Sequence, residues 1–167
     1  NECMSCIPEG MKAMVSPILV LTLAWSLKAM TDSLGLADFV SGLVEGMGGA
    51  AVGLIPAALC LIACILAFAS GTSWGTFGIL IPIGLAITES HPELATPIIA
   101  ACMAGAVYGD HCSPISDTTI MASAGASCNH ISHVSTQLPY ATTVAVVAFI
   151  SYLIAGFTGG WVIPLIV

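Results

Sequence analysis

The chain has 167 residues, of which 57% are hydrophobic and only 7% are charged. Soluble domains carry about 25% charged residues, so the composition excludes an ordinary water-soluble globule and indicates an integral membrane protein. Lys12 and Lys28 are the only basic residues. The sequence therefore has no basic patch, which argues against nucleic acid as a partner, and two lysines give little information on orientation in the membrane.

The chain begins with a polar lead-in over residues 1–13, and we expect a single membrane domain over residues 14–167. Residues 15–30, VSPILVLTLAWSLKAM, have about the length of one spanning helix once flanking residues are included. Residues 31–49 contain acidic side chains and glycines, and predict an interfacial helix or a partly polar connector. The N-terminus shows no signal-peptide pattern, and we expect the chain to be part of a longer protein.

Residues 46–88 contain no formal charge over 43 positions, which is enough for two short membrane segments. The stretch SGTSWGT, residues 70–76, interrupts them with two glycines and four hydroxyl side chains. Small polar residues can satisfy a turn inside the membrane, so we expect a re-entrant hairpin with a helix break at Gly71 and Gly75. An ordinary loop between two full spans is the alternative.

Residues 87–97, ITESHPELATP, predict a water-exposed loop, and an apolar helix is expected from Ala95 onward. After Leu94 the chain has two charged side chains, Asp110 and Asp117. A helix that starts at Ala95 reaches Asp110 after ~22 Å of rise, inside a hydrocarbon layer that is ~30 Å thick. Because a charge within the membrane is costly, such carboxylates are candidates for a functional site.

Pro114 lacks an N–H group, so the carbonyl of Asp110 loses its helical partner and the helix is expected to break. A break would present free carbonyls together with the carboxylates and nearby hydroxyls, which come from Ser113, Ser116, Thr118 and Thr119. These hard oxygen ligands suit a small hard cation such as Na⁺. If the segment stays helical instead, Asp110, Ser113 and Asp117 fall on one stripe.

Two carboxylates that lie close together in a low-dielectric medium resist full ionisation. The Asp110 and Asp117 pair is therefore expected to hold either a proton or a sodium ion, as an exchanger requires. The alternative is that the pair only caps helix ends at a structural break. His111 is a candidate neighbour for handling the proton, or for orienting the carboxylate of Asp110.

Histidines and cysteines near this segment raise a second possibility, a zinc site. The candidate ligands are His111, Cys112, Cys128, His130 and His133. Their spacing matches no compact zinc pattern, and His130 and His133 are interpreted more simply as interfacial polar residues. Residues 128–140 are polar without charge, and residues 141–167 predict one more span. In total we expect an all-α, polytopic protein with four to six membrane-crossing or re-entrant segments.

Two stretches carry a family resemblance: FASGTSWGTFGILIPI at residues 68–83 and the segment at residues 105–141 that contains GDHCSPISDTT. They resemble the C-terminal half of the NhaC-type sodium/proton antiporter family, with departures at Asn129 and Ser135, where an acidic and a basic residue are expected. The resemblance implies exchange of Na⁺ for H⁺ across a prokaryotic plasma membrane. It also implies two inverted repeats, each with a re-entrant hairpin and a broken helix.

By the same resemblance, Ser73, Trp74 and Thr76 lie at the hairpin tip and face the broken helix. The implied partners are the lipid bilayer and either the missing N-terminal half or a second copy, as in a homodimer. No cofactor is implied beyond the transported Na⁺ and H⁺. Some similar proteins exchange organic acids, such as malate for lactate, so an organic-acid exchanger or an inactive half-transporter are the alternatives. An enzyme is not expected, because no nucleophile–base arrangement accompanies the aspartates.

Overall fold

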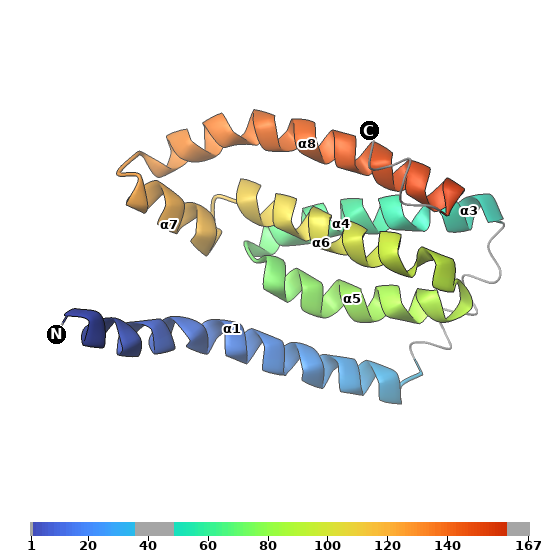
Figure 1. Ribbon diagram of the computed structural model, residues 1–167, viewed down its shortest axis with the longest axis horizontal. Helices are drawn as coiled ribbons and strands as arrows, with labels where there is room; N and C mark the ends of the chain where they lie inside the picture. Colours follow the sequence, from blue (N-terminus) through green and yellow to red (C-terminus); the bar gives the residue numbers. More distant parts are fainter. Residues whose placement is uncertain (1, 36–48, 160–167) are drawn as a thin grey trace.

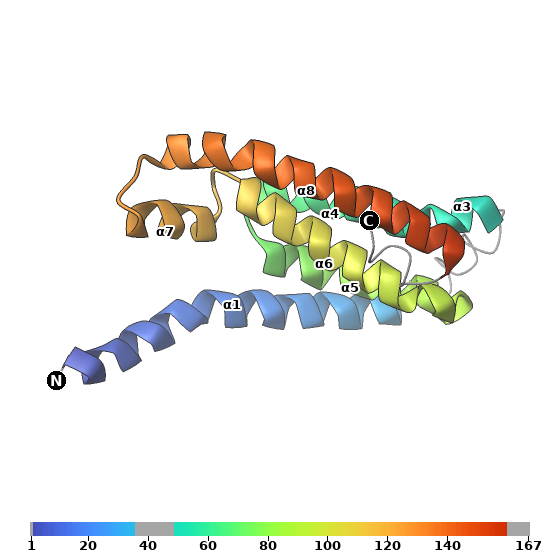
Figure 2. The ribbon, with the colours of Figure 1, turned by 45° about the horizontal axis from the view of Figure 1, so that its top comes forward.

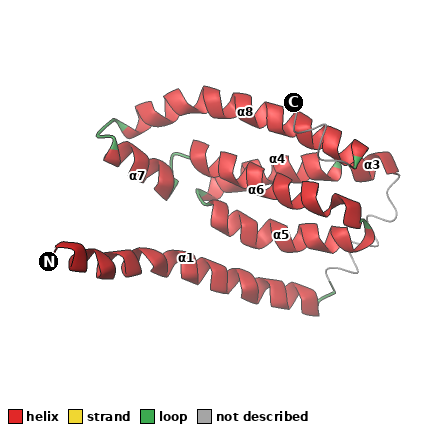
Figure 3. Ribbon diagram, viewed as in Figure 1, coloured by secondary structure: helices red, strands yellow, loops and turns green. Residues whose placement is uncertain are grey.

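The computed structural model describes residues 2–35 and 49–159 (Figure 1). Within these ranges every regular element is helical (Figure 3), in agreement with the all-α expectation. The helices are α1 (Glu2–Ser33), α3 (Gly49–Gly53), α4 (Ile55–Ser70), α5 (Ser73–Ser90), α6 (Ala95–Cys112), α7 (Asp117–Gly125) and α8 (His130–Thr158).

Helix α1 is continuous from Glu2 onward, so the described residues of the polar lead-in form its first turns rather than a separate segment. An exposed ion pair between Lys12 and Glu9 stands on these turns. Further along, α1 runs beside α5, while its N-terminal part extends past the other helices (Figure 2). The connector expected at residues 31–49 falls mostly outside the described residues.

The centre of the fold is a close contact between α4 and α6, made possible by small residues on both helices. A Cβ atom on Gly109 of α6 would lie 2.7 Å from Ala67 Cβ and 2.6 Å from the backbone nitrogen of Phe68 on α4. Gly105, one turn earlier, faces Ala63 in the same way. Small residues that let helix backbones approach are a common means of packing helices in membranes. These contacts, which we call the α4–α6 seam, fix how far α6 can slide along α4.

Helix α8 covers α4 and α6 on one side of the seam, and α5 packs against α6 and α4 as well (Figure 1). Tyr152 of α8 donates a hydrogen bond of 3.0 Å to the carbonyl of Ala100 on α6. At the far end, Gly156 of α8 lies directly against Gly53 of α3. These contacts hold α8 along the length of the helix pair.

The interruption predicted at residues 70–76 is present, but it is only two residues long. Helix α4 ends at Ser70 and is followed by the C-cap residue Gly71, whose φ of 67° is the left-handed conformation that favours glycine. Thr72 is the N-cap of α5, and its side chain accepts a hydrogen bond from the backbone of Gly75. Gly75 therefore does not lie at the break as expected, because the cap at Thr72 already places it in the first turn of α5.

The second break also lies where the sequence predicts it. Helix α6 begins at Ala95 and ends at Cys112, and α7 begins at Asp117, so residues 113–116 around Pro114 are not helical. Both breaks lie at the same end of the helical bundle (Figure 1). The structure therefore places these two breaks close to each other.

The loop predicted at residues 87–97 is shorter than expected, because α5 continues to Ser90 and a single 3₁₀ turn at Pro92–Leu94 leads into α6. A ring nitrogen of His91 lies 3.0 Å from the Glu93 carboxylate. A backbone hydrogen bond lowers the pKa of the exposed Glu93, and this contact with His91 lowers it further.

Two helical segments of the described chain are long and apolar enough to cross a membrane, namely Ala51–Ser70 and His130–Thr158. A shorter apolar helix covers Ser73–Glu89. The polar residues after Cys128, expected as a separate stretch, form the first turns of α8 from His130 onward. Helix α8 is therefore long because the polar residues from His130 to Tyr140 and the apolar residues after them form one continuous helix.

Candidate ion-binding site

The carboxylate of Asp110 is buried in the last turn of α6, with 5% of the residue exposed. Ser73 Oγ, from the first residue of α5, donates a hydrogen bond of 3.0 Å to Asp110 Oδ2. Ser116 Oγ, from the residue before α7, donates a hydrogen bond of 2.6 Å to Asp110 Oδ1. Hydrogen bonds to an ionised acceptor are stronger than neutral ones, so each break supplies one hydroxyl that stabilises the charged carboxylate.

A second hydroxyl extends the contact on the Oδ1 side. Ser116 Oγ lies 2.7 Å from Thr118 Oγ1. Ser116 is fully buried, whereas Thr118 is exposed in this chain. The two side chains therefore connect the buried carboxylate with the surface of α7.

The backbone of the second break is held from two directions. Ser113, which is fully buried, donates from its hydroxyl to the carbonyl of Phe68 near the end of α4, at 2.8 Å. Thr119 Oγ1 donates to the carbonyl of His111 at 3.2 Å and lies 3.4 Å from that of Asp110. The Asp110 carbonyl also accepts from the N–H of Ser113 at 3.2 Å. The carbonyl groups released by Pro114 are thus partly satisfied by local hydroxyl and amide groups.

The two breaks also touch directly. A Cβ atom on Gly71 would lie 2.9 Å from Ile115 Cγ1 and 3.0 Å from the carbonyl oxygen of Ile115. A residue with a side chain could not take this position without moving one of the two segments. Gly71 therefore serves both the left-handed turn and the approach of the α4–α5 turn to the α6–α7 break.

His130, the first residue of α8, contacts the second break. Its Nε2 atom lies 2.7 Å from the carbonyl oxygen of Pro114, and its Nδ1 atom lies 3.1 Å from Ser123 Oγ. Because Nε2 must donate to the carbonyl, it carries a proton in this arrangement. The interpretation of His130 as an interfacial polar residue missed this role. Within the described part of the chain, no three His, Cys, Asp or Glu side chains gather as a metal would require.

Asp117 does not join Asp110 in the buried cluster. It is exposed in this chain as the first residue of α7, and its Oδ1 accepts a hydrogen bond of 2.8 Å from the backbone N–H of Thr118. The single stripe expected for a continuous helix does not form, because the non-helical residues 113–116 change the direction of the chain before Asp117. The buried cluster therefore contains one carboxylate.

The remaining predicted residues are distributed around this cluster. Thr76 is buried and donates to the carbonyl of Thr72 at 3.0 Å, within the first turn of α5. Trp74 is 53% exposed and packs edge-to-face on Phe77, with ring centroids 5.9 Å apart. His111 is exposed. Of the residues predicted at the hairpin tip, Ser73 is the one that contacts Asp110.

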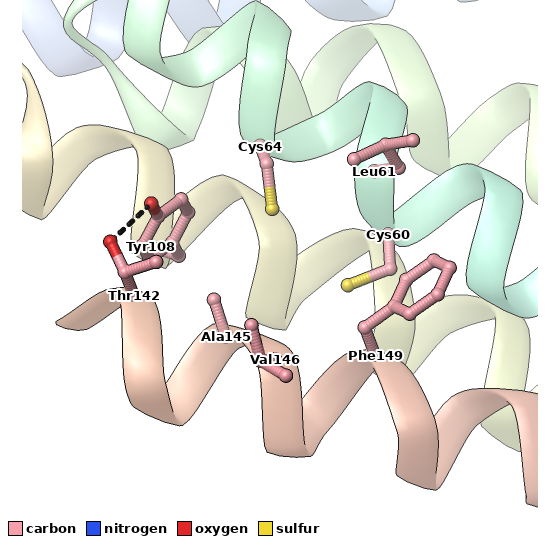
Figure 4. A pocket seen from close by; sticks show the side chains of 8 residues that line it. All are labelled: Cys60, Leu61, Cys64, Tyr108, Thr142, Ala145, Val146 and Phe149. Atoms are coloured by element: carbon pink, nitrogen blue, oxygen red, sulfur yellow. Dashed lines mark hydrogen bonds between the residues drawn. The ribbon is translucent and has the colours of Figure 1, made fainter.

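A separate cavity of about 280 Å³ lies between α4, α6 and α8 (Figure 4). Its lining is almost entirely apolar and includes the thiols of Cys60 and Cys64. Tyr108 and Thr142 close one side with a hydrogen bond of 3.1 Å between their hydroxyl groups. Since its lining contains no carboxylate, this cavity lacks the ligands that a hard cation needs.

A buried carboxylate that accepts hydrogen bonds from hydroxyl groups at two helix breaks, in an apolar chain whose described elements are helical, is typical of membrane transporters that exchange small ions. The comparison with known proteins agrees with this class. The chain belongs to the Na⁺/H⁺ antiporter family, whose model matches residues 1–157.

Several curated proteins are similar to the chain. A Haemophilus influenzae protein described as uncharacterized is 47% identical over 89% of this chain and 28% of its own length. The malate-2H⁺/Na⁺-lactate antiporter of Bacillus subtilis is 35% identical over 60% of the chain and 21% of its own length. The arginine/ornithine antiporter of Halobacterium salinarum is 35% identical over 64% of the chain and 24% of its own length.

The chain thus spans about a quarter of the length of the curated relatives that it matches. No solved structure shows a significant match to it. Two of the relatives are named as antiporters for different substrates, so antiporter activity is the feature that their names share.

Proposed function

We propose that the full-length protein is a multi-pass transporter of the prokaryotic plasma membrane that exchanges Na⁺ for H⁺, and that Asp110 holds either ion. The observation that supports this proposal most directly is the buried Asp110 carboxylate, bonded to Ser73 and Ser116 at the meeting of two helix breaks. A cation at this carboxylate and a proton on it exclude each other. That exclusion is the basis of an exchange mechanism.

The ligand chemistry fits sodium. The carboxylate of Asp110 and the hydroxyl oxygens of Ser73 and Ser116 are hard ligands, and sodium is a hard cation. When Na⁺ binds, the two hydroxyl groups rotate their hydrogens away and offer lone pairs to the ion. When Asp110 is protonated instead, its hydroxyl group replaces the cation. Ser113 and Thr119 hold the break in place, and either could add an oxygen ligand after rotation.

Asp117 and His111 take outer roles in this proposal. Asp117 adds a negative charge at the exposed start of α7, a few residues from the buried carboxylate. A carboxylate at the mouth of a site raises the local concentration of cations. His111 follows Asp110 in the sequence and is exposed at the end of α6, outside the buried cluster.

We further propose that α4 and α5 form a re-entrant hairpin, with its tip at Gly71 and Thr72. The buried hydroxyl groups at this tip support the proposal, because that of Ser73 contacts Asp110 and that of Thr76 donates to the carbonyl of Thr72, so neither faces solvent. Since the chain spans about a quarter of its relatives, an inverted repeat elsewhere in the full-length protein, or a second copy, would supply the opposing half.

The second candidate function is the exchange of an organic acid or an amino acid with coupled ions. The names of the Bacillus subtilis and Halobacterium salinarum relatives favour it. The chain contains no arginine, since its two basic residues are lysines. A substrate carboxylate would therefore need backbone amides, hydroxyl groups or residues from the rest of the full-length protein.

One experiment separates the two functions. The full-length protein is reconstituted in liposomes that contain a pH-sensitive dye, and sodium chloride is added outside. Sodium-driven proton movement without any organic acid supports Na⁺/H⁺ exchange. Proton movement that appears only when malate, lactate or arginine is also supplied would replace this proposal by organic-solute exchange.

A further inference from the structure

Three oxygen atoms form a continuous chain from the buried carboxylate to the surface. Asp110 Oδ1 accepts from Ser116 Oγ at 2.6 Å, and Ser116 Oγ lies 2.7 Å from Thr118 Oγ1. Both distances are typical of strong O–H···O hydrogen bonds. The burial of the residues changes along the chain, since Asp110 and Ser116 are buried and Thr118 is exposed.

The direction of these hydrogen bonds follows from the number of hydrogens. A serine hydroxyl has one hydrogen to donate, and that of Ser116 points to the carboxylate of Asp110. The hydrogen between Ser116 and Thr118 must therefore belong to Thr118. Both O–H groups point inward, so the lone pairs of Thr118 Oγ1 remain available to accept a proton at the exposed end.

We propose that Ser116 and Thr118 form a hydroxyl relay that carries protons between Asp110 and the exposed side of α7. This inference rests on the proposed Na⁺/H⁺ exchange and assigns its proton path. It gives the two carboxylate oxygens different tasks. Oδ1 exchanges protons through Ser116, whereas Oδ2 is bonded to Ser73, whose hydroxyl contacts Asp110 and leads to no second hydroxyl within the described residues.

Each transfer conserves protons along the relay. A proton from water binds Thr118 Oγ1, the original Thr118 hydrogen moves to Ser116 Oγ, and the original Ser116 hydrogen moves to Asp110 Oδ1. Three O–H bonds form and two O–H bonds of the relay break, together with the one in the donor water cluster. The carboxylate ends neutral, and the hydroxyl groups can rotate back to the starting arrangement once Asp110 has released its proton. Asp117, next to Thr118, lies where it can attract protons to the outer end.

The test uses the full-length protein in liposomes and measures two fluxes for each variant. The first is the sodium-driven proton flux, and the second is the exchange of radioactive Na⁺ for unlabelled Na⁺, which needs no proton transfer. Thr118→Val removes the outer hydroxyl at nearly constant volume, and Thr118→Ser keeps it. We expect Thr118→Val to lower the ratio of proton flux to sodium exchange about tenfold, as for the loss of one hydrogen bond of ordinary strength from the transition state.

The controls separate a relay from a general effect on the site. Thr118→Ser should keep the wild-type ratio, and Thr118→Ala, whose smaller side chain cannot crowd α7, should show the same loss as Thr118→Val. Ser73→Ala should lower both fluxes together and leave the ratio unchanged. In D₂O the wild-type proton flux should fall more than its sodium exchange.

An unchanged ratio in both Thr118→Val and Thr118→Ala, with a wild type that exchanges Na⁺ for H⁺, would overturn the relay and leave the proposed exchange intact. A wild type that exchanges labelled sodium without any sodium-driven proton flux would overturn the proposed function itself, and the relay with it.

Discussion

Ser73 Oγ donates to Asp110 Oδ2 over 3.0 Å, which joins the first residue of α5 to the last turn of α6 across 37 positions of the sequence. Ser116, in the second break, donates a hydrogen bond to the other carboxylate oxygen. The position of Asp110 is therefore fixed by both helix breaks, and a substitution in either break should alter the position or the hydrogen bonding of the carboxylate.

Ser73→Ala should weaken sodium binding. It removes one of the two hydroxyl groups that contact Asp110 and leaves Oδ2 without its donor in a buried position. In the proposed site the Ser73 hydroxyl is also a direct ligand of the bound sodium, and the loss of an interaction of about 2 kcal/mol with a charged group should raise the sodium concentration for half-maximal exchange at least about tenfold. Sodium titrations of exchange in liposomes measure this shift. The matched control is Ser151→Ala, whose hydroxyl donates only to Val147 in its own helix; an equal shift in both variants would remove the special role of Ser73.

Gly109→Ala should destabilise the fold and displace Asp110. The added methyl group would meet the Cys64 carbonyl at 2.5 Å and the Phe68 backbone nitrogen at 2.6 Å, and neither backbone group can turn away. Overpacking of this kind costs about 1–3 kcal/mol. Thermal unfolding of the purified protein in detergent should show a lower midpoint. Gly125→Ala is the control, because a Cβ at Gly125 meets nothing within 4 Å. Comparable midpoints for the two variants would contradict the close α4–α6 packing.

Gly71→Ala should cost more than the same change at Gly159. Both glycines end helices with positive φ, at 67° and 62°. Each substitution therefore pays about 1–2 kcal/mol for the left-handed conformation. Only at Gly71 would the methyl group also meet Ile115, in the second break. A larger loss of stability and of exchange at Gly71 is expected. Equal losses at the two sites would mean that the contact between the breaks contributes nothing measurable.

Much of this arrangement can be predicted from local sequence signals. Pro114 explains the end of α6, because a residue without an N–H cannot continue the helical hydrogen bonds. The cluster of glycine and hydroxyl residues at 70–76 likewise marks the α4–α5 turn. The helix start at Ala95 follows from the apolar run behind Pro92 and Glu93. These features depend on residues close together in the chain, and the structure has them where the sequence indicates.

The partners across the breaks could not be predicted in the same way. Whether Asp117 lies beside Asp110 depends on the path of residues 113–116, and periodicity describes only a continuous helix. The bond from His130 to the Pro114 carbonyl spans 16 positions and needs the direction in which α7 returns to α8. One contact between helices did have a usable sequence signal. Gly105 and Gly109 are four residues apart, as are Ala63 and Ala67, which they face. Small residues at this spacing are typical of closely packed membrane helices.

The most direct test of the account is sodium-driven proton movement in liposomes with the full-length protein and its Asp110→Asn variant. Asparagine keeps the size of the side chain but cannot hold a proton and a cation in turn. The control is Glu93→Gln, an exposed carboxylate in the turn before α6. We predict that exchange disappears in Asp110→Asn and persists in Glu93→Gln, with both variants folded to the same thermal midpoint. Full sodium-driven proton exchange in Asp110→Asn would contradict the central claim that this carboxylate carries the transported ions.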